Sequence, residues 1–204
     1  MKKRFGFTLA EVLITLGIIG VVAAMTIPTL MNQTGQAEFK TGFKKIISTL
    51  NQAITMNVAL DSTDFSGLSV AGSADGSIYN MFNTRMNVVR VLTAADATGV
   101  DVGATGPVIG NASNYALFFN DGMVISFPST ITGCLTTSTG CDALVDVNGA
   151  KKPNKLTNCQ SSLLTDGAGT CTSTNAIIGD RFSIRFGGQQ VVPNGQGARY
   201  VMYN

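Results

Sequence analysis

Apolar residues run from Val12 to Leu30 without a charged side chain, and the next charge is Glu38. A helix over residues 12–30 would be about 28 Å long, close to the hydrocarbon thickness of a bilayer. Three basic residues at positions 2–4 precede the run, and basic flanks favour the cytoplasmic side of a membrane. The pattern predicts a signal-anchor helix, with everything after Leu30 outside the cytoplasm.

Beyond Pro28 the apolar residues recur in steps of three and four, which is the period of an amphipathic helix. We expect one helix to continue from the membrane segment to about Asn57, with its apolar stripe packed against a core. A partner-binding role for the same stripe is the alternative. The stripe consists of Phe39, Phe43, Ile46, Ile47, Leu50, Ile54 and Val58, and Lys40, Lys44 and Lys45 lie on or beside the opposite face.

The rest of the chain shows short helical and strand patterns. A second helix is expected over residues 78–92 and a loop over 93–112. Asp121-Gly122 between two apolar runs is a strong hairpin signal. Strands are expected over residues 115–120, 123–127, 143–147, 181–186 and, as a closing pair, 190–192 with 200–203. The predicted fold class is therefore α+β, with a long amino-terminal helix packed on a small antiparallel sheet.

Composition narrows the class of protein. Only 13% of the residues are charged, 23 are Gly, and many are Ser, Thr or Asn, which favours a secreted or surface β-rich protein. The chain has no His, which excludes Ser-His-Asp triads and His-ligated metal sites. The sequence also carries no phosphate-loop or dinucleotide fingerprint. We therefore expect a protein that is not an enzyme.

The amino-terminal motif is Gly6-Phe7-Thr8-Leu9-Ala10-Glu11, which follows a short basic leader and opens the apolar run. This string resembles the type III signal of the type IV pilin and type II secretion pseudopilin superfamily. The resemblance implies that a prepilin peptidase cuts between Gly6 and Phe7, that Phe7 is then N-methylated, and that Glu11 serves assembly. It also implies a lollipop shape, with a leader over residues 1–6, a stem helix over 7–57 whose part 7–30 is transmembrane, and a head over 58–204.

The chemistry of Glu11 fits this resemblance. A carboxylate in a membrane helix costs about 2.5–3.5 kcal/mol at the helix centre and less toward an end, so it normally marks function. The Phe7 amine of a neighbouring helix is a cation that would turn the lone buried charge into a pair. Such a pair forms at one stagger only, and it would set the register of subunits entering a filament.

The resemblance implies a structural subunit of a type IV pilus-like or type II secretion pseudopilus filament. Its partners would be other filament subunits, prepilin peptidase, an inner-membrane assembly platform and membrane lipid. The chain would first sit in the inner membrane with a periplasmic head, and then in a filament on the periplasmic side or at the cell surface. A minor pilin that binds surfaces or takes up DNA at the filament tip is the alternative, and a lone signal-anchored protein is a third.

All four cysteines, Cys134, Cys141, Cys159 and Cys171, lie in the exported part. An even number outside the cytoplasm argues for disulfides, with three possible connectivities. Proximity in sequence favours Cys134–Cys141 and Cys159–Cys171. A zinc site is the alternative, disfavoured because no C-x-x-C spacing and no His is present.

A second resemblance lies in the head. Asp146-Val147-Asn148-Gly149, followed by Pro153-Asn154 and by Gly179-Asp180-Arg181-Phe182, resembles a turn pattern of many pilin-like proteins. The chain departs from that pattern by an insertion over residues 155–178, which we expect to be a surface loop.

The resemblance also makes calcium a candidate ligand at the same place, because some pseudopilins bind Ca²⁺ in the carboxy-terminal region. Asp146, Asn148 and Asp180 are the candidate ligands. Lys151 and Lys152 would repel a cation, however, and Asn148-Gly149 is more simply a tight turn. We therefore expect no cofactor.

The charge of the chain argues against nucleic acid as a partner. Lys151, Lys152 and Lys155 lie beside a predicted aromatic strand, where they could contact a phosphate backbone. The formal net charge is only +2, and lysines beside a turn usually form a solvated face.

Overall fold

The computed structural model describes residues 6–68, 77–92, 114–128, 131, 133–135, 141–149, 151–159 and 171–204. The chain divides into two compact units, Met1–Glu38 and Phe39–Asn204. Helix α1 (Leu9–Asp61) makes up most of the described part of the first unit and continues into the second. It ends four residues beyond the expected Asn57, where Ser62 adopts a positive φ of 54° that stops the helix.

The second half of α1 buries the apolar stripe that its periodicity predicts. Phe43, Leu50 and Ile54 are fully buried, and together with Ile46 and Ile47 they belong to the main hydrophobic core. The ring of Phe43 stacks on that of Phe182, with 4.2 Å between centroids. The prediction that the stripe packs against a core is therefore confirmed.

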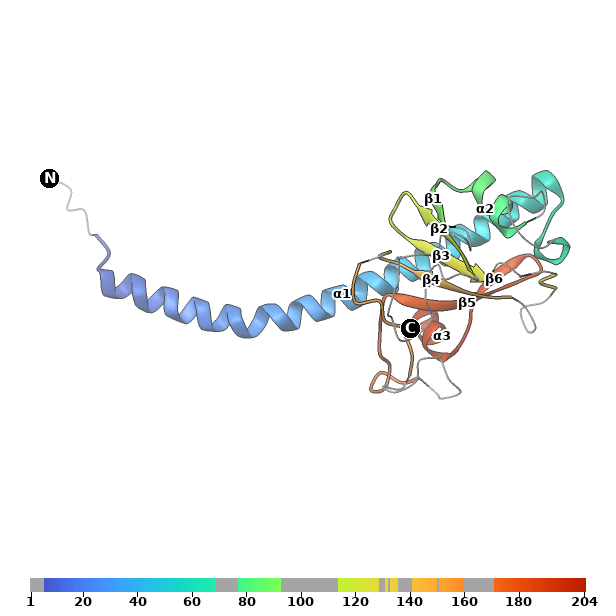
Figure 1. Cartoon of the computed structure of the whole chain (residues 1–204). Coiled ribbons are helices and arrows are strands. Elements are labelled where there is room, and N and C mark those ends of the chain that lie inside the picture. The colour runs from blue at the N-terminus through green and yellow to red at the C-terminus, as the bar shows by residue number, and fades with distance from the viewer. Residues whose placement is uncertain are drawn as a thin grey trace. The chain divides into compact units, whose positions relative to one another are not determined.

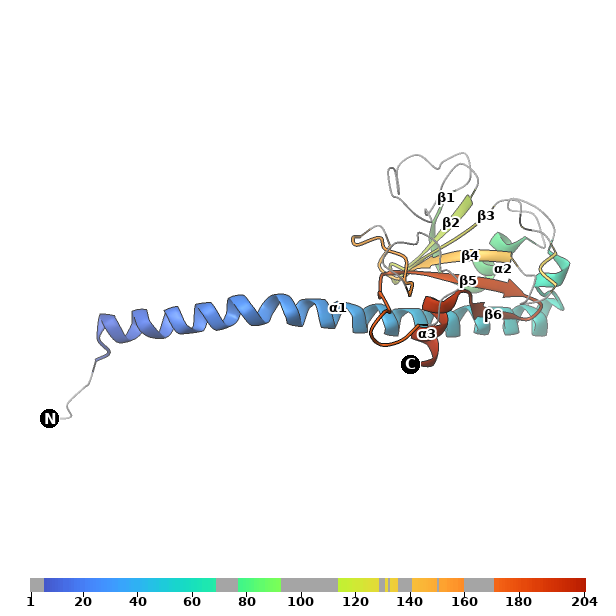
Figure 2. The same cartoon turned by 90° about the horizontal axis from the view of Figure 1, so that it is seen from below.

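The described strands form one six-stranded sheet whose spatial order equals the chain order, and every neighbouring pair is antiparallel (Figures 1 and 2). The α+β class with an antiparallel sheet is thus confirmed, as is the Asp121-Gly122 hairpin between the second and third strands. The strands are β1 (Val88–Leu92), β2 (Asn114–Phe119), β3 (Val124–Pro128), β4 (Cys141–Asp146), β5 (Arg181–Gly187) and β6 (Gln190–Pro193).

The two faces of the sheet take alternate residues, as the period of a strand requires. Leu117, Ile125 and Val145 join the core that contains α1. Their chain neighbours Ala116, Val124 and Leu144 form a second, smaller cluster with Leu92 and Leu156. The sheet is therefore apolar on both faces in its centre, with the larger core on the α1 side.

Residues 78–92 are not one helix, so that prediction is wrong. They form helix α2 (Ile78–Arg85) and strand β1 (Val88–Leu92). Met86 leaves the helix with an extended backbone, and the Val-Val-Arg-Val sequence that follows favours a strand because β-branched side chains suit a pleated surface.

The expected closing strand at residues 200–203 is also wrong. These residues belong to helix α3 (Gln196–Tyr203), which contacts β5 and β6. Ala198 and Val201 are three apart and fully buried, so helical spacing, and not alternation, brings them into the core.

A side chain of α1 fixes this helix to the last strand. Asn51 Nδ2 donates to the carbonyl oxygen of Val191 at 3.0 Å, and Asn51 Oδ1 accepts from the Val191 N–H at 2.9 Å. The amide thereby takes the place of a neighbouring strand for one residue of β6.

Candidate functional site

The residues around the predicted cleavage site precede the regular part of α1. Gly6, Phe7 and Thr8 are not helical, and the first intrahelical bond runs from Val12 N to the Thr8 carbonyl oxygen. Phe7 is 90% exposed. The Gly6–Phe7 peptide bond therefore lies in non-helical chain, two residues before the first helical residue, Leu9.

Thr8 and Glu11 form a reciprocal cap on the first turn. Glu11 Oε2 accepts from the Thr8 N–H at 2.8 Å and from the Thr8 hydroxyl at 2.7 Å, and the Glu11 N–H donates to Thr8 Oγ1 at 3.3 Å. This is the capping-box arrangement, in which two otherwise unpaired backbone donors are satisfied. It was not among the expectations from sequence, although the Thr-x-x-Glu spacing signals it.

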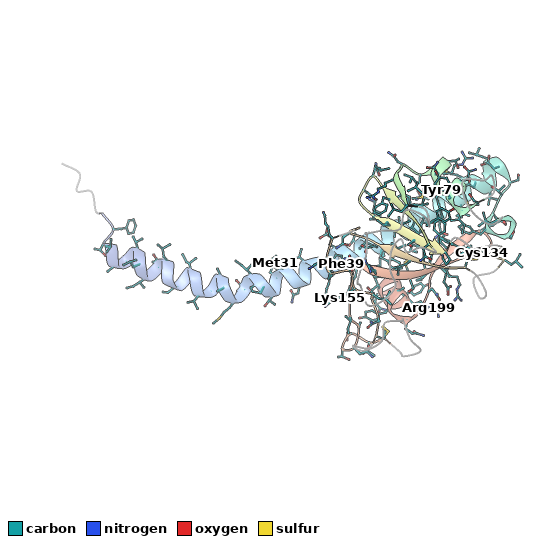
Figure 3. All side chains as sticks on the ribbon, in the orientation of Figure 1. Met31, Phe39, Tyr79, Cys134, Lys155 and Arg199 are labelled. Atoms are coloured by element: carbon teal, nitrogen blue, oxygen red, sulfur yellow. A yellow bond between two sulfur atoms is a disulfide. The ribbon has the colours of Figure 1, made fainter. Side chains whose placement is uncertain are left out.

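The first half of α1 exposes apolar side chains that no described residue covers. Leu9 is 80% exposed, and the large hydrophobic residues from Val12 to Met31 are exposed as well. By length and composition this part of α1 is sufficient to cross a membrane, and none of its most apolar 18-residue stretch is buried. Figure 3 shows these side chains along the first half of the helix, up to the labelled Met31.

Two of the hydroxyl groups inside the apolar segment are bonded within the helix. The hydroxyl of Thr15 donates to the Val12 carbonyl oxygen, and that of Thr26 donates to the Val22 carbonyl oxygen, both at 3.0 Å. A hydroxyl bonded in this way needs no water. Thr15 and Thr26 are thus compatible with an apolar environment around this segment.

A second group of polar residues lies at the ends of β4 and β5. Asp146 Oδ2 accepts from Arg181 Nε at 2.9 Å, and its Oδ1 accepts from the Asn148 N–H at 3.1 Å. Asp146 is fully buried and Arg181 is 2% exposed. Burial raises the pKa of Asp146 to about 7, because removal from water outweighs the bond from Arg181.

Asp180 holds the next turn of the chain in place. Its two carboxylate oxygens accept from the N–H groups of Asn154 and Lys155, each at 2.7 Å. Gly179 lies so close to Lys155 that a Cβ there would fall 2.1 Å from the Lys155 carbonyl oxygen. The three separate stretches of the head motif thus meet in one place, around residues 146–149, 153–155 and 179–182.

The three calcium candidates do not present a free ligand set. Asp146 already has the Arg181 cation, and both oxygens of Asp180 accept backbone N–H groups. Asn148 keeps a buried Oδ1 that has no partner among the described residues. In the described part of the chain no group of three His, Cys, Asp or Glu residues could hold a metal ion. This geometry gives no support to the calcium alternative at Asp146, Asn148 and Asp180, and the expectation of no cofactor stays a prediction.

The cysteines form the two disulfides that proximity favours. Cys134 is bonded to Cys141 and Cys159 to Cys171, with Cα–Cα distances of 5.5 and 5.0 Å. None of the four is left for a metal. The second disulfide joins the two described ends of the 155–178 insertion, which also pair through Asn158 and Ile177. Residues 160–170 of that insertion lie outside the described residues.

Comparison with known proteins bears on the amino-terminal site. Residues 1–27 match the family model described as the prokaryotic N-terminal methylation motif, which is the signal of type IV pilins and pseudopilins. No curated protein sequence and no solved structure matches the chain. The motif covers Gly6, Phe7, Glu11 and most of the apolar segment. It supports a type IV pilin-like or pseudopilin subunit, a structural class that assembles with other pilin subunits after processing by prepilin peptidase.

Proposed function

We propose that the chain is the precursor of a structural subunit of a type IV pilus-like or type II secretion pseudopilus filament. Prepilin peptidase removes residues 1–6, and the new amino-terminal Phe7 is methylated. The observation that carries this proposal is the methylation motif joined directly to an apolar, uncovered helix segment. That surface needs lipid around it before assembly and other stem helices around it afterwards.

The state of the chain at the cleavage site supports processing. A peptidase must hold its substrate bond in an accessible backbone, and the Thr8–Glu11 cap begins the helix only after Gly6–Phe7. The basic residues at positions 2–4 favour a position of this bond at the cytoplasmic face of the inner membrane, which supports a head in the periplasm.

Glu11 supplies the assembly contact in this proposal. Both bonds from Thr8 fall on Oε2, so Oε1 is available to the methylated amine of a neighbouring Phe7. The pair removes the cost of a lone carboxylate in an apolar environment. Because one amine meets one carboxylate, the contact also fixes the stagger between neighbouring stems.

Three variants separate the charge of Glu11 from its capping role. Glu11→Ala loses both, and Glu11→Gln keeps a capping acceptor without the charge. Thr8→Ala keeps the charge and loses the two cap bonds that the Thr8 hydroxyl makes. An unpaired buried amine costs about 3–5 kcal/mol, which corresponds to more than about a hundredfold loss of filament. Glu11→Ala and Glu11→Gln should therefore be exported and cut at Gly6 but fail to assemble. Thr8→Ala loses only about 1 kcal/mol of helix stability and should still form filaments.

The measurement is the amount of the chain in sheared-filament and membrane fractions of cells that carry each variant. Normal filament yield from Glu11→Gln, with failure of Thr8→Ala, would assign Glu11 a capping role and refute the charge pair. The share of this chain in wild-type filaments also distinguishes a major subunit from a minor one.

A further inference from the structure

The lysines of the mature chain are confined to two short segments. All six lysines after the leader lie within residues 40–45 and 151–155. The structure brings these segments to one end of the unit Phe39–Asn204. A Cβ on Gly42 of α1 would lie 3.2 Å from the Cβ of Val147, and the Asn148 side chain donates to the Lys152 carbonyl oxygen at 3.2 Å. Figure 3 labels Phe39 and Lys155 at this end.

These residues form a surface of one charge sign. Lys44, Lys45, Lys151, Lys152 and Lys155 are exposed. Lys45 pairs with Asp121 at 2.7 Å, and it alone among the six has a carboxylate partner within the part of the chain that the structure describes. Of the nearby carboxylates, Asp146 and Asp180 are buried and already bonded. Asp121 is held by Lys45, and Glu38 lies two residues before Lys40 in the sequence. We call Lys40, Lys44, Lys45, Lys151, Lys152 and Lys155 the lysine surface.

Acidic residues lie at the other end of the same unit. Asp61 ends α1 and Asp64 caps the short 3-10 helix Phe65–Gly67. Lys40 and Asp61 are separated by about 32 Å along α1 at the usual helical rise. The lysines therefore mark a positive end of the unit, next to its start at Phe39, whereas at the other end Asp61 is paired with Arg85.

The positive end is also the end joined to the apolar segment. Lys40 follows Leu30 by ten residues, which is about 15 Å of helix. The headgroup layer of a bilayer takes up about 5–8 Å beyond the hydrocarbon, and charges act over about 8 Å more at physiological salt. The lysine surface is therefore joined to the membrane segment by a link short enough for attraction to lipid phosphates.

We propose that the lysine surface binds the anionic headgroups of phospholipids beside the inserted helix and holds the head of the unassembled subunit against the membrane. This inference rests on the proposed function only in requiring that α1 enters a bilayer. Lipid is favoured over nucleic acid because the same chain provides the membrane segment within ten residues of Lys40.

The test uses the full processed chain in lipid nanodiscs. One set of discs contains phosphatidylcholine alone, and the other contains about 30% phosphatidylglycerol. A water-soluble acetylating reagent modifies accessible amines, and mass spectrometry gives the rate at each lysine. We expect the six lysines to react several-fold more slowly in the anionic discs, and we expect 0.5 M NaCl to remove the difference, because salt screens headgroup attraction.

Matched variants show whether the lysines act as one surface. Replacing Lys151, Lys152 and Lys155 together with Gln should restore fast reaction at Lys40 and Lys44, and replacing the same three with Arg should leave both protected. Arg90→Gln is the control, because Arg90 lies on β1 over the ring of Phe118.

Equal rates in both kinds of disc would overturn the inference and leave the filament proposal intact. Protection in neutral discs as well would overturn it, because charge would then not be the cause. Protection by duplex DNA without protection by phosphatidylglycerol would assign the surface to nucleic acid. Failure to recover the chain in any disc would show that α1 does not enter a bilayer, and it would overturn both proposals.

Discussion

Asp146 and Arg181 are an ion pair almost completely removed from water, and they are also cross-strand partners in the register of β4 and β5. Such a pair contributes little net stability compared with apolar residues, because removing two charges from water offsets their attraction. Breaking one partner is nevertheless costly. The pair therefore specifies how the two strands align, and Asp180 adds the turn at residues 154–155 to the same arrangement.

The raised pKa of Asp146 makes the free energy of unfolding of the head depend on pH. The folded chain binds this proton more tightly than the unfolded chain, since the pKa is about 7 against an ordinary 3.8. The contribution of Asp146 to the free energy of unfolding is therefore complete below about pH 4. It is lost as the pH rises to about 7, at no more than about 1.4 kcal/mol per pH unit.

Thermal unfolding of the processed chain in detergent, followed by the circular dichroism of its four Tyr residues, measures this dependence. Asp146→Asn should remove this part of the pH slope between pH 4.5 and 7.5. Asp142→Asn is the matched control, because Asp142 is exposed and pairs with Arg185 on the same two strands. Parallel pH curves for wild type and Asp146→Asn would show that Asp146 does not titrate in this range.

At the scale of the elements, α1 and the sheet depend on each other through Asn51. Its amide satisfies both the N–H and the carbonyl of Val191, which is 2% exposed. No alternation or periodicity in the sequence marks this contact, since the two residues are 140 positions apart.

Asn51→Leu should lower the free energy of unfolding by about 1–3 kcal/mol, because it leaves two buried backbone groups of Val191 without partners. Gln52→Leu is the control on the same helix, because Gln52 is exposed and makes only a 3.4 Å contact with Ser48. Unfolding followed in the same detergent should show a loss of several degrees in Tm for the first variant and little change for the second. Equal Tm values for both variants would contradict the role given to Asn51.

The elements that the sequence predicted correctly are those with a long or distinctive pattern. The stripe of α1 repeats over many turns, and Asp121-Gly122 is a turn signal with a direct steric cause. The errors fell on short segments. Val88–Leu92 and Gln196–Tyr203 are so short that their apolar residues fit both the helical and the strand period. Tertiary contacts therefore decide which of the two forms.

The candidate sites also differ in how far the sequence predicts them. The amino-terminal motif is local in sequence, and the methylation-motif match covers it. The ion pair of Asp146 and Arg181 depends on the register of two strands 35 residues apart, and the lysine surface depends on a turn meeting α1 at Gly42. No single stretch of sequence predicts long-range contacts of this kind.

For the whole molecule, the two units have opposite solvent requirements. Phe39–Asn204 has its own hydrophobic core, with buried residues from α1, α2, α3 and every strand except β1. Met1–Glu38 has no buried large side chain among its described residues and exposes its apolar surface. A chain of this kind requires a second apolar environment outside itself, which in the proposed filament model a membrane provides first and a bundle of subunit stems provides later.

The amino terminus of the chain recovered from its own cell membranes tests the central claim most directly. Intact-mass and amino-terminal peptide analysis should give a chain that begins at N-methylated Phe7, and Gly6→Ala, with a Cβ at the position before the cut, should retain the leader. An unprocessed wild-type chain, or a mature terminus at any residue other than Phe7, would contradict the assignment as a pilin-like subunit.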